Sequence, residues 1–383
     1  ELWIHAVSVG EVNAATPLVQ SLLRRNPSIR ILITTMTPTG ASRVIDTFGA
    51  SVVHRYAPYD YPFAIRRFLE RFRPKLLVLM ETEIWPNMIA LCHHQQIAVA
   101  MANVRLSAKS ARGYQMIRPL IQDALQKVSA FAAQSQADKD NLLRLGVDPT
   151  KVLKTGSTKF EIEMAPSVSE VAQAVRRDWG PNRAVVVAGS THEGEEVLLL
   201  RVLSQLLRKF PDLLMVIAPR HPERFEAVTR LVAKNGLAFT QRTVHQGPLD
   251  ANVAVQIADT MGELPILYGA ADIAVVGGSL IPIRGIGGHN ILEPCAVGVP
   301  VVFGKNMSNF IEISELTLAE DAGFQVENED QLISILIRLL EDASLRAKVG
   351  EHGRDLIKRH AGATEKTLNL ILPLLSSQST ATR

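Results

Sequence analysis

The chain has 383 residues, of which 47% are hydrophobic and 21% are charged, and this composition indicates a globular protein long enough for about two domains. A formal net charge of +3 is too small to indicate nucleic-acid binding, although it is compatible with an anionic substrate or an anionic membrane surface. The two cysteines, Cys92 and Cys295, lie far apart and lack the spacing of metal ligands, which favours a reduced, cytosolic compartment with both thiols in the core.

No apolar run approaches the ~20 residues that cross a bilayer as a helix. The longest runs, at 76–80 and 184–189, have the length of strands. The sequence nevertheless begins without methionine and almost inside a predicted strand. We therefore expect that an amino-terminal segment with a membrane anchor precedes residue 1 in the native protein.

Short runs of β-branched and apolar residues alternate with segments of helical periodicity along the whole chain. In the first half, we predict strands at 2–7, 30–35, 51–55, 76–80, 97–102 and 129–133. In the second half, we predict strands at 184–189, 213–218, 253–257, 272–276 and 299–303. The predicted helices include 12–25, 194–209, 222–235 and 329–341. Strands that are apolar on both faces and separated by single helices predict parallel sheets with right-handed crossovers.

Two such series of strands predict an α/β protein with two Rossmann-like, doubly wound domains that face each other across a cleft. We place the amino-terminal domain at 1–158 and the carboxyl-terminal domain at 159–383, and the last helices are candidates for packing back on the first domain. A polar stretch at about 156–183, which contains Pro166 and Pro181, is the predicted linker. Ligands of open parallel sheets bind beyond the carboxyl ends of the strands, so site residues are expected there.

The first predicted strand runs into Ser8-Val9-Gly10, and the carboxylate of Glu11 follows where a helix should begin. One interpretation is an acid that stabilises the helix dipole, which is worth ~0.3–1 kcal/mol. The other interpretation is a base at the mouth of an active site. The local sequence is compatible with both.

Residues 275–304 combine a buried strand, the turn Gly277-Gly278-Ser279 and a second glycine pair before a predicted helix. Adjacent glycines let the backbone approach a ligand closely, and a helix start offers free N–H groups to a phosphate. Glu293 lies three residues after Asn290, where a carboxylate could accept both hydroxyls of a ribose. A tight strand-to-helix connection with an acidic first turn is the alternative, but the VGVP sequence that follows favours a nucleotide site.

Nine segments between residues 2 and 304 carry a resemblance to a known family. They read SVGE (8–11), TMTPTG (35–40), METEIWPN (80–87), NVRLS (103–107), TGSTKF (155–160), STHEGEE (190–196), PRHPER (219–224), DTMGEL (259–264) and GGHNILEP (287–294). In this order they resemble the 3-deoxy-D-manno-octulosonic acid (Kdo) transferases of lipid A biosynthesis, which are glycosyltransferases of the two-Rossmann GT-B architecture. Two departures are the extra residues around Arg284, before GGHN, and the lack of an amino-terminal hydrophobic anchor.

The resemblance implies an inverting transfer of Kdo from cytidine monophosphate (CMP)-Kdo to the lipid A precursor lipid IVA, without a metal ion or other cofactor. It implies an acceptor-binding first domain, a donor-binding second domain, and work at the cytoplasmic face of the bacterial inner membrane. Glu11 would be the general base, and Glu81 and Lys159 would stabilise the transition state. The implied contacts to CMP are Pro219, Arg220, Met261, Gly262, Glu263, Asn290, Ile291, Leu292 and Glu293.

The chemistry of the residues is compatible with these roles. An attacking alcohol must lose its proton, which requires a carboxylate or a histidine within hydrogen-bond reach, as Glu11 would supply. One base and displacement from the opposite face give inversion. A lysine such as Lys159 can meet developing phosphate charge or the sugar carboxylate, and the fork of donors on Arg220 suits phosphate.

Structural interpretations remain open beside these roles. Glu81, which we expect on the same side of a strand end as Glu83, could be an acid paired with a nearby arginine, and we expect Glu83 and Trp85 to organise the turn into the next helix. Lys159 could be a surface lysine, and 259–264 could be a simple capping turn. The histidines lack metal-ligand spacing and are expected in the core, in loops or on the surface; they are His93, His94, His192 and His221.

Two basic segments are candidates for substrate or membrane contact. The stretch 61–75 mixes phenylalanines with arginines and could touch an anionic bilayer or lipid phosphates. A core-facing amphipathic helix with a solvated basic face is the alternative. The stretch 103–114 supplies Arg105, Lys109 and Arg112 and is a candidate acceptor site.

Two other functions fit the same architecture. One is a UDP-sugar transferase or epimerase, which would be stabilised by UDP and not by CMP. The other is a non-catalytic nucleotide-binding protein, which would bind CMP without turnover. The joint presence of Glu11, Glu81 and Lys159 argues against the non-catalytic protein.

Overall fold

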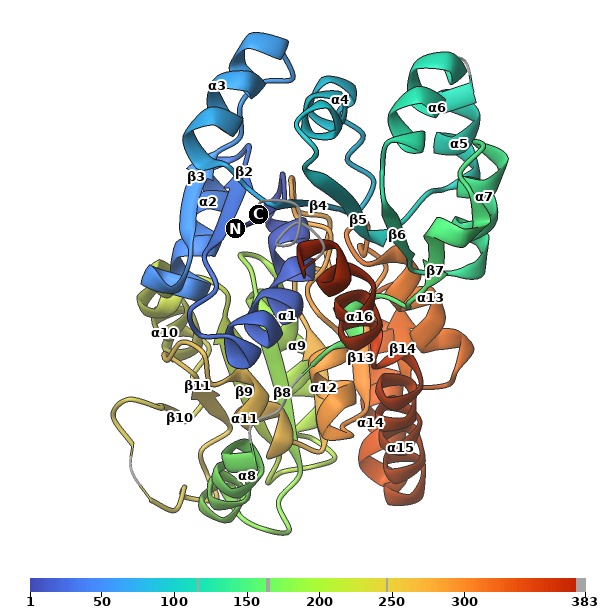
Figure 1. Cartoon of the computed structure of the whole chain (residues 1–383). Helices are drawn as coiled ribbons and strands as arrows, with labels where there is room; N and C mark the ends of the chain where they lie inside the picture. Colours follow the sequence, from blue (N-terminus) through green and yellow to red (C-terminus); the bar gives the residue numbers. More distant parts are fainter. Residues whose placement is uncertain (116, 163–165, 246, 377–383) are drawn as a thin grey trace. The chain divides into compact units, whose positions relative to one another are not determined.

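The computed structural model describes residues 1–115, 117–162, 166–245 and 247–376 (Figure 1). The chain divides into two compact units. The first unit consists of Glu1–Glu161 together with the chain from His360 onward, and the second consists of Ile162–Arg359. The division falls between Glu161 and Ile162 rather than between 158 and 159, so Lys159 is part of the first unit.

The first unit contains a seven-stranded parallel sheet in the order β3-β2-β1-β4-β5-β6-β7. Its strands are β1 (Leu2–His5), β2 (Ile31–Thr35), β3 (Val53–Tyr56), β4 (Leu76–Met80), β5 (Ala98–Val104), β6 (Ala130–Ala133) and β7 (Val152–Lys154). The order reverses at β1, which pairs with β2 on one side and β4 on the other, as in a doubly wound fold.

Helices cover both faces of this sheet, and each face has its own buried hydrophobic cluster. The helices are α1 (Val9–Arg25), α2 (Pro38–Phe48), α3 (Pro62–Phe72), α4 (Pro86–His94), α5 (Ala108–Gln115), α6 (Arg118–Gln126), α7 (Gln136–Arg144) and α16 (Ala363–Ser376). The last of these, α16, packs against α1, β5 and β6, with Leu368 and Ile371 buried in the cluster (Figure 1).

The second unit repeats the design with a parallel sheet in the order β10-β11-β9-β8-β12-β13-β14. Its strands are β8 (Val185–Thr191), β9 (Leu214–Pro219), β10 (Phe239–Gln241), β11 (Val255–Ile257), β12 (Ile273–Val276), β13 (Val301–Gly304) and β14 (Gly323–Val326). Its helices are α8 (Pro166–Trp179), α9 (Glu195–Leu206), α10 (Phe225–Lys234), α11 (Leu264–Gly269), α12 (Leu292–Val297), α13 (Ile311–Ala319), α14 (Glu329–Glu341) and α15 (Ala343–His360). The predicted α/β class with two doubly wound sheets is confirmed.

The predicted linker at 156–183 is wrong over much of its length. Residues Pro166–Trp179 form α8, which packs against α11 inside the second unit. Val175 and Trp179 are buried, and the Trp179 indole N–H donates a hydrogen bond to the amide oxygen Oε1 of Gln256 at 2.8 Å. The polar residues of this stretch occupy the solvent face of an amphipathic helix. Because such a face has the polar composition of a linker, composition alone does not distinguish the two.

Candidate functional site

Glu11 lies in the first turn of α1, directly after β1. Ser8 caps this helix, and its hydroxyl accepts a hydrogen bond from the Glu11 backbone N–H at 3.4 Å. The Glu11 carboxylate turns back on the same turn, where Oε2 accepts from the Val7 N–H at 2.7 Å and Oε1 accepts from the Ser8 hydroxyl at 2.9 Å. These bonds give Glu11 a structural role at the start of α1, beside the N-cap residue Ser8.

Glu11 is nevertheless buried, since only 7% of the residue is exposed to solvent. Burial raises its pKa from 4.5 to about 7, and the charges of Glu83 and Glu81 act in the same direction. The hydrogen bonds from Val7 and Ser8 lower the pKa and offset part of this rise. A carboxyl group with a pKa near neutrality has the proton affinity of a general base or acid.

The sequence predicts that Glu81 follows the pleat of β4, but it does not. The strand ends at Met80, and Glu81 adopts a left-handed backbone conformation with φ of 55°. Its backbone N–H donates to Ala102 on the neighbouring strand at 2.8 Å. A left-handed glutamate is unfavourable and turns the chain sharply away from the sheet, so the expected alternation of Glu81 and Glu83 does not apply.

Glu83 and Trp85 have a structural role in the turn after β4. The Trp85 indole N–H donates to Glu83 Oε2 at 2.6 Å, and the Trp85 ring meets the ring of His5 edge-on with centroids 5.0 Å apart. Burial lowers the pKa of His5 to about 4, so this imidazole is neutral at pH 7. In the turn into α4, Trp85 therefore contacts the neutral imidazole of His5 and the carboxylate of Glu83.

Lys159 is anchored by backbone and side-chain contacts of its neighbour Thr158. The Thr158 N–H donates to Asn103 Oδ1 at 3.0 Å, and its hydroxyl donates to the carbonyl of Ala14 on α1 at 2.7 Å. The Lys159 ammonium lies 3.0 Å from Glu81 Oε1, and both side chains are about one-quarter exposed, at 26% and 25%. Lys159 is thus not a free surface lysine, and the partner of Glu81 is this lysine rather than an arginine.

The candidate acceptor segment 103–114 starts within the buried end of β5. Arg105 and Arg112 are exposed, whereas the side chain of Lys109 lies outside the described residues. Asn103 is completely buried, and sequence analysis did not assign it a role. The available signal was its place at the end of an apolar strand, inside the NVRLS segment.

In the second unit, Arg220 follows directly after β9, whose last residue is the buried Pro219. Its backbone N–H donates to the Thr191 carbonyl at 3.0 Å, which fixes the turn. Its side chain is exposed and forms no hydrogen bond or ion pair within the described part of the chain. The guanidinium is therefore available to a ligand.

His192 and His289 form a hydrogen-bonded imidazole pair near this arginine's segment. Their Nε2 atoms are 2.7 Å apart, so one ring donates and the other accepts. Burial lowers the pKa of both rings, that of His289 to about 3, so the pair is neutral at pH 7. Across the residues that the structure describes, no group of three or more His, Cys, Asp or Glu side chains is arranged to hold a metal ion.

Glu195, at the start of α9, organises the glycine turn after β12. Its buried carboxylate accepts four backbone N–H groups, from His192, Gly278, Ser279 and Leu280, at 2.8 to 3.1 Å. Burial raises its pKa, and these hydrogen bonds oppose the rise. Sequence analysis did not single out Glu195; the signal was an acid at a predicted helix start, within STHEGEE.

The glycines of this turn are required by packing. A Cβ on Gly277 would lie 2.6 Å from the Ser190 carbonyl oxygen, and one on Gly278 would lie 2.7 Å from the His289 ring. The structural interpretation of the glycine pair is therefore sufficient to explain it. Any phosphate contact is an additional role of the same backbone.

The segment Asn290–Glu293 contains the start of α12, whose first residue is Leu292. Asn290 Oδ1 accepts the Leu292 N–H at 3.1 Å, and Asn290 Nδ2 donates to Glu293 Oε1 at 3.3 Å. The side chains of Ile291 and Leu292 are fully buried. These two residues can contact a ligand only through their backbone.

Met261, Gly262 and Glu263 precede α11. Met261 is 55% exposed, and Gly262 has φ of 79°. Glu263 Oε2 accepts from Arg242 Nε at 2.6 Å, and this bond lowers the pKa of the carboxyl group. Thr260, Arg242 and Glu263 line a cavity of about 340 Å³.

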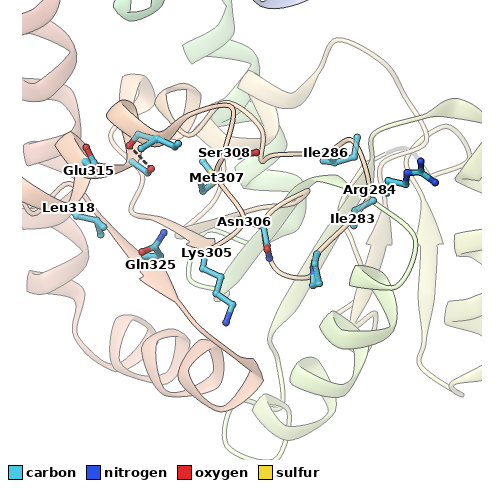
Figure 2. A pocket seen from close by; sticks show the side chains of 13 residues that line it. Ile283, Arg284, Ile286, Lys305, Asn306, Met307, Ser308, Glu315, Leu318 and Gln325 are labelled. Carbon is cyan, nitrogen blue, oxygen red and sulfur yellow. Dashed lines mark hydrogen bonds between the residues drawn. The ribbon is translucent and has the colours of Figure 1, made fainter. Parts of the chain in front are cut away.

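The extra residues around Arg284 lie on a loop that borders a second, larger cavity of about 640 Å³ (Figure 2). Its walls also come from Lys305–Ser308 after β13 and from α13. Figure 2 shows the Arg284 side chain directed away from Met307 and Ser308. Lys305, which also lines this cavity, forms an ion pair with Glu327 at 3.1 Å.

Comparison with known proteins gives a consistent result for both units. Residues 1–162 match the family model described as 3-deoxy-D-manno-octulosonic-acid transferase (kdotransferase), and residues 169–356 match glycosyl transferases group 1. The 3-deoxy-D-manno-octulosonic acid transferase of Haemophilus influenzae is 40% identical over 375 residues, which cover 98% of this chain and 87% of the relative. The chain belongs to the 3-deoxy-D-manno-octulosonic acid transferase family.

Further comparisons agree with membership of the Kdo transferase family. The 3-deoxy-D-manno-octulosonic acid transferase of Bordetella pertussis is 34% identical over 97% of this chain and 86% of its own length. Among solved structures, UDP-GlcNAc 2-epimerase from Neisseria meningitidis superimposes with a TM-score of 0.61 over 97% of this chain and 99% of that chain, at 16% identity. At this identity the likeness concerns the fold alone. The expected family and enzyme class are confirmed.

The raised pKa of Glu11 predicts a pH-dependent contribution to stability. Between pH 4.5 and about 7, the folded protein retains a proton that the unfolded chain has lost, so the stability that this residue contributes falls as the pH rises through that range. We predict that Glu11→Gln, which does not titrate, becomes more stable relative to the wild type between about pH 5 and about pH 8. Thermal unfolding of both proteins at each pH measures this, and a pH-independent difference would contradict the raised pKa.

Proposed function

We propose that this protein is an inverting glycosyltransferase that moves Kdo from CMP-Kdo to lipid IVA during lipopolysaccharide biosynthesis. The observation that carries the proposal is the buried carboxyl group of Glu11, with a pKa raised to about 7, in a chain of the Kdo transferase family. The relatives are named for transfer of this sugar acid. We propose CMP-Kdo as the donor and lipid IVA as the acceptor.

In the proposed reaction, Glu11 accepts the proton of the attacking acceptor hydroxyl. The oxygen of that hydroxyl forms a bond to the anomeric carbon, the bond from that carbon to the phosphate breaks, and CMP leaves with the electron pair. Attack from the face opposite CMP inverts the anomeric centre. The hydrogen bonds from Val7 and Ser8 hold the carboxylate in one orientation, which reduces the cost of positioning it.

Glu81 and Lys159 would stabilise the charges that develop during transfer. The 3.0 Å ion pair places a carboxylate and an ammonium side by side in a partly buried setting, where their fields are stronger than in water. The carboxylate suits positive character on the sugar ring, and the ammonium suits the departing phosphate or the carboxylate of Kdo. Both signs of charge are thus supplied without a metal ion or other cofactor.

The second unit would hold the nucleotide. The exposed guanidinium of Arg220, after Pro219, suits the phosphate, and Glu293 suits the ribose hydroxyls. Asn290 donates to Glu293 and would orient it, whereas Ile291 and Leu292 would contribute backbone groups. Met261, Gly262 and Glu263 would contact CMP around the turn before α11, with the Glu263 carboxylate held by Arg242.

We also propose that α3 and the chain before it bind the anionic cytoplasmic face of the bacterial inner membrane. Ile65, Phe68 and Leu69 fill the core, so the core-facing interpretation holds for this side of the helix. Tyr59, Tyr61 and Phe63 are instead exposed by 69%, 60% and 75%.

The arrangement of these aromatic side chains supports contact with lipid. The rings of Tyr61 and Phe63 are nearly parallel with centroids 6.0 Å apart, and Tyr59 lies 6.5 Å from Tyr61. Exposed aromatic clusters beside arginines are typical of membrane-interface binding. The exposed arginines of α3 are Arg66, Arg67 and Arg71. None of the helices in the described part of the chain is long and apolar enough to cross a bilayer.

The first prediction from the proposed function concerns Glu11→Gln. The amide keeps the shape of the side chain but cannot take up the acceptor's proton, so we expect single-turnover transfer to slow by roughly 10²–10⁴-fold. CMP affinity should change little, because the loss affects the chemical step.

Asp138→Asn is the matched control, since Asp138 occupies the same third position of a serine-capped helix, α7. This control should lose stability while transfer stays near the wild-type rate. Transfer by Glu11→Gln within a few-fold of the wild type would leave Glu11 as a helix cap only.

A second prediction concerns the donor site. Arg220→Ala and Glu293→Ala each remove a polar partner of CMP, and we expect each to weaken CMP binding by about tenfold or more, as calorimetry can measure. Arg201→Ala, an exposed arginine paired with Glu329, should leave CMP affinity unchanged. Wild-type binding of UDP in preference to CMP would instead indicate a UDP-sugar enzyme.

A third prediction concerns the membrane surface. The double variant Tyr61→Ser, Phe63→Ser should bind vesicles of phosphatidylcholine and phosphatidylglycerol at least about tenfold more weakly than the wild type, because two rings no longer leave water. Val171→Ser, an exposed apolar residue of α8, is the control and should bind normally. Equal sedimentation of the double variant and the wild type with these vesicles would refute this surface.

A further inference from the structure

Asn103 lies near the end of β5, is completely buried and has a left-handed backbone with φ of 56°. Asparagine tolerates this conformation better than most side chains, but it remains unusual inside a strand. The register of β5 against β6 shifts between Met101 and Val104, where Asn103 interrupts the ladder. The Gln134 side chain donates to the Asn103 carbonyl at 2.9 Å and satisfies it in place of a strand partner.

The neighbouring strand, β4, is also followed by a left-handed residue at the matching register position. Met80 on β4 pairs with Ala102 on β5, and the next residue on each strand, Glu81 and Asn103, is left-handed. The Glu81 N–H donates to the Ala102 carbonyl at 2.8 Å. Two uncommon backbone conformations therefore occur side by side at the carboxyl end of the sheet, and strain of this kind is concentrated at functional sites.

The side chain of Asn103 links this strand end to the segment that carries Lys159. Its Oδ1 accepts the Thr158 N–H at 3.0 Å. Only the amide oxygen can accept this bond, so the contact fixes which way the amide faces. Nδ2 is then buried without a hydrogen-bond partner among the described residues, which is a cost to the fold.

These contacts close a ring. The Glu81 N–H is hydrogen-bonded to the carbonyl of Ala102, which precedes Asn103 in β5. The Asn103 side chain accepts a hydrogen bond from Thr158, and the next residue, Lys159, forms the 3.0 Å ion pair with Glu81. Thr158 also donates to the Ala14 carbonyl of α1, the helix whose first turn carries Glu11. The side chains of Asn103 and Thr158 thus link the segments that carry Glu81 and Lys159 to the helix that carries Glu11.

We propose that Asn103 is a positioning residue that holds Thr158, and through it Lys159, against Glu81. This inference rests on the proposed function, since it assigns to Asn103 the placement of a cation used in transfer. Asn103 retains a costly unpaired amide group because its oxygen fixes the position of that cation. Displacement of a charged group by about 1 Å can slow a reaction by about 100-fold.

The test combines Asn103→Gly with Lys159→Met. Glycine accepts the left-handed backbone without strain but removes the amide oxygen that holds Thr158. We expect Asn103→Gly to lower kcat by roughly 10- to 100-fold with KM for CMP-Kdo within about threefold of the wild type. In the Lys159→Met background, the same change should cost less than about twofold further, because the residue acts through Lys159.

Gln96→Gly is the matched control, because Gln96 is an exposed, left-handed residue in the turn before β5 and outside the ring. Its kcat should be that of the wild type. An Asn103→Gly kcat within threefold of the wild type would refute the positioning role. An equal loss of kcat in the wild-type and Lys159→Met backgrounds would also refute it.

Amide hydrogen exchange separates this inference from the proposed function. The Thr158 N–H should exchange at least about tenfold faster in Asn103→Gly than in the wild type, whatever reaction the protein catalyses. Unchanged exchange at Thr158 would refute the positioning role on its own. A wild-type protein that transfers no Kdo, but shows this exchange difference, would refute the proposed function and leave the contact between Asn103 and Thr158 in place.

Discussion

The candidate site of the first unit depends on one buried carboxylate, that of Glu11. This group is hydrogen-bonded to the start of the helix that carries it. The Glu11 side chain satisfies the Val7 N–H and the Ser8 hydroxyl, which fixes the chain between β1 and α1. The same placement removes the group from water and raises its pKa to about 7. Capping and proton affinity therefore have one cause, and the two interpretations of Glu11 do not exclude each other.

The second unit has a carboxylate in the corresponding place with a different outcome. Each of the two sheets has an interior strand, β1 or β8, followed by a helix whose first turn carries a buried glutamate. Glu195 accepts four backbone N–H groups, whereas Glu11 accepts one N–H and one hydroxyl. Glu195 holds the turn after β12 through its four hydrogen bonds, and burial raises the pKa of both carboxyl groups. In both units the first helical turn after this strand therefore carries a buried glutamate, with a structural role for Glu195 and a proposed proton-accepting role for Glu11.

Much of this fold could be predicted from sequence because its strands are buried on both faces. Continuous apolar runs marked β1, β4, β8 and β9, and the periodicity of 329–341 predicted the bounds of α14. Strands β7, β10 and β14 escaped prediction because they are three or four residues long and partly exposed. Such strands have too few buried positions to form a pattern.

The candidate site could be predicted only as a set of segments. Sequence motifs located Glu11, Glu81 and Lys159, but not the ion pair between the last two, since residues 81 and 159 meet only in the folded sheet. The left-handed conformation of Glu81 was also not predictable, because it follows from the bond to Ala102 on a neighbouring strand. Asn103 and Glu195 hold other residues in place, and this role leaves no spacing signal in the sequence.

The return of α16 to the first unit has a consequence for how the protein is made. Leu368 and Ile371 complete the hydrophobic cluster on one face of the first sheet, yet they are translated after the whole of Ile162–Arg359. On the ribosome, the part of this face that α16 covers therefore stays exposed until the second unit has emerged. The second unit, which is continuous in the chain, can finish folding before the first.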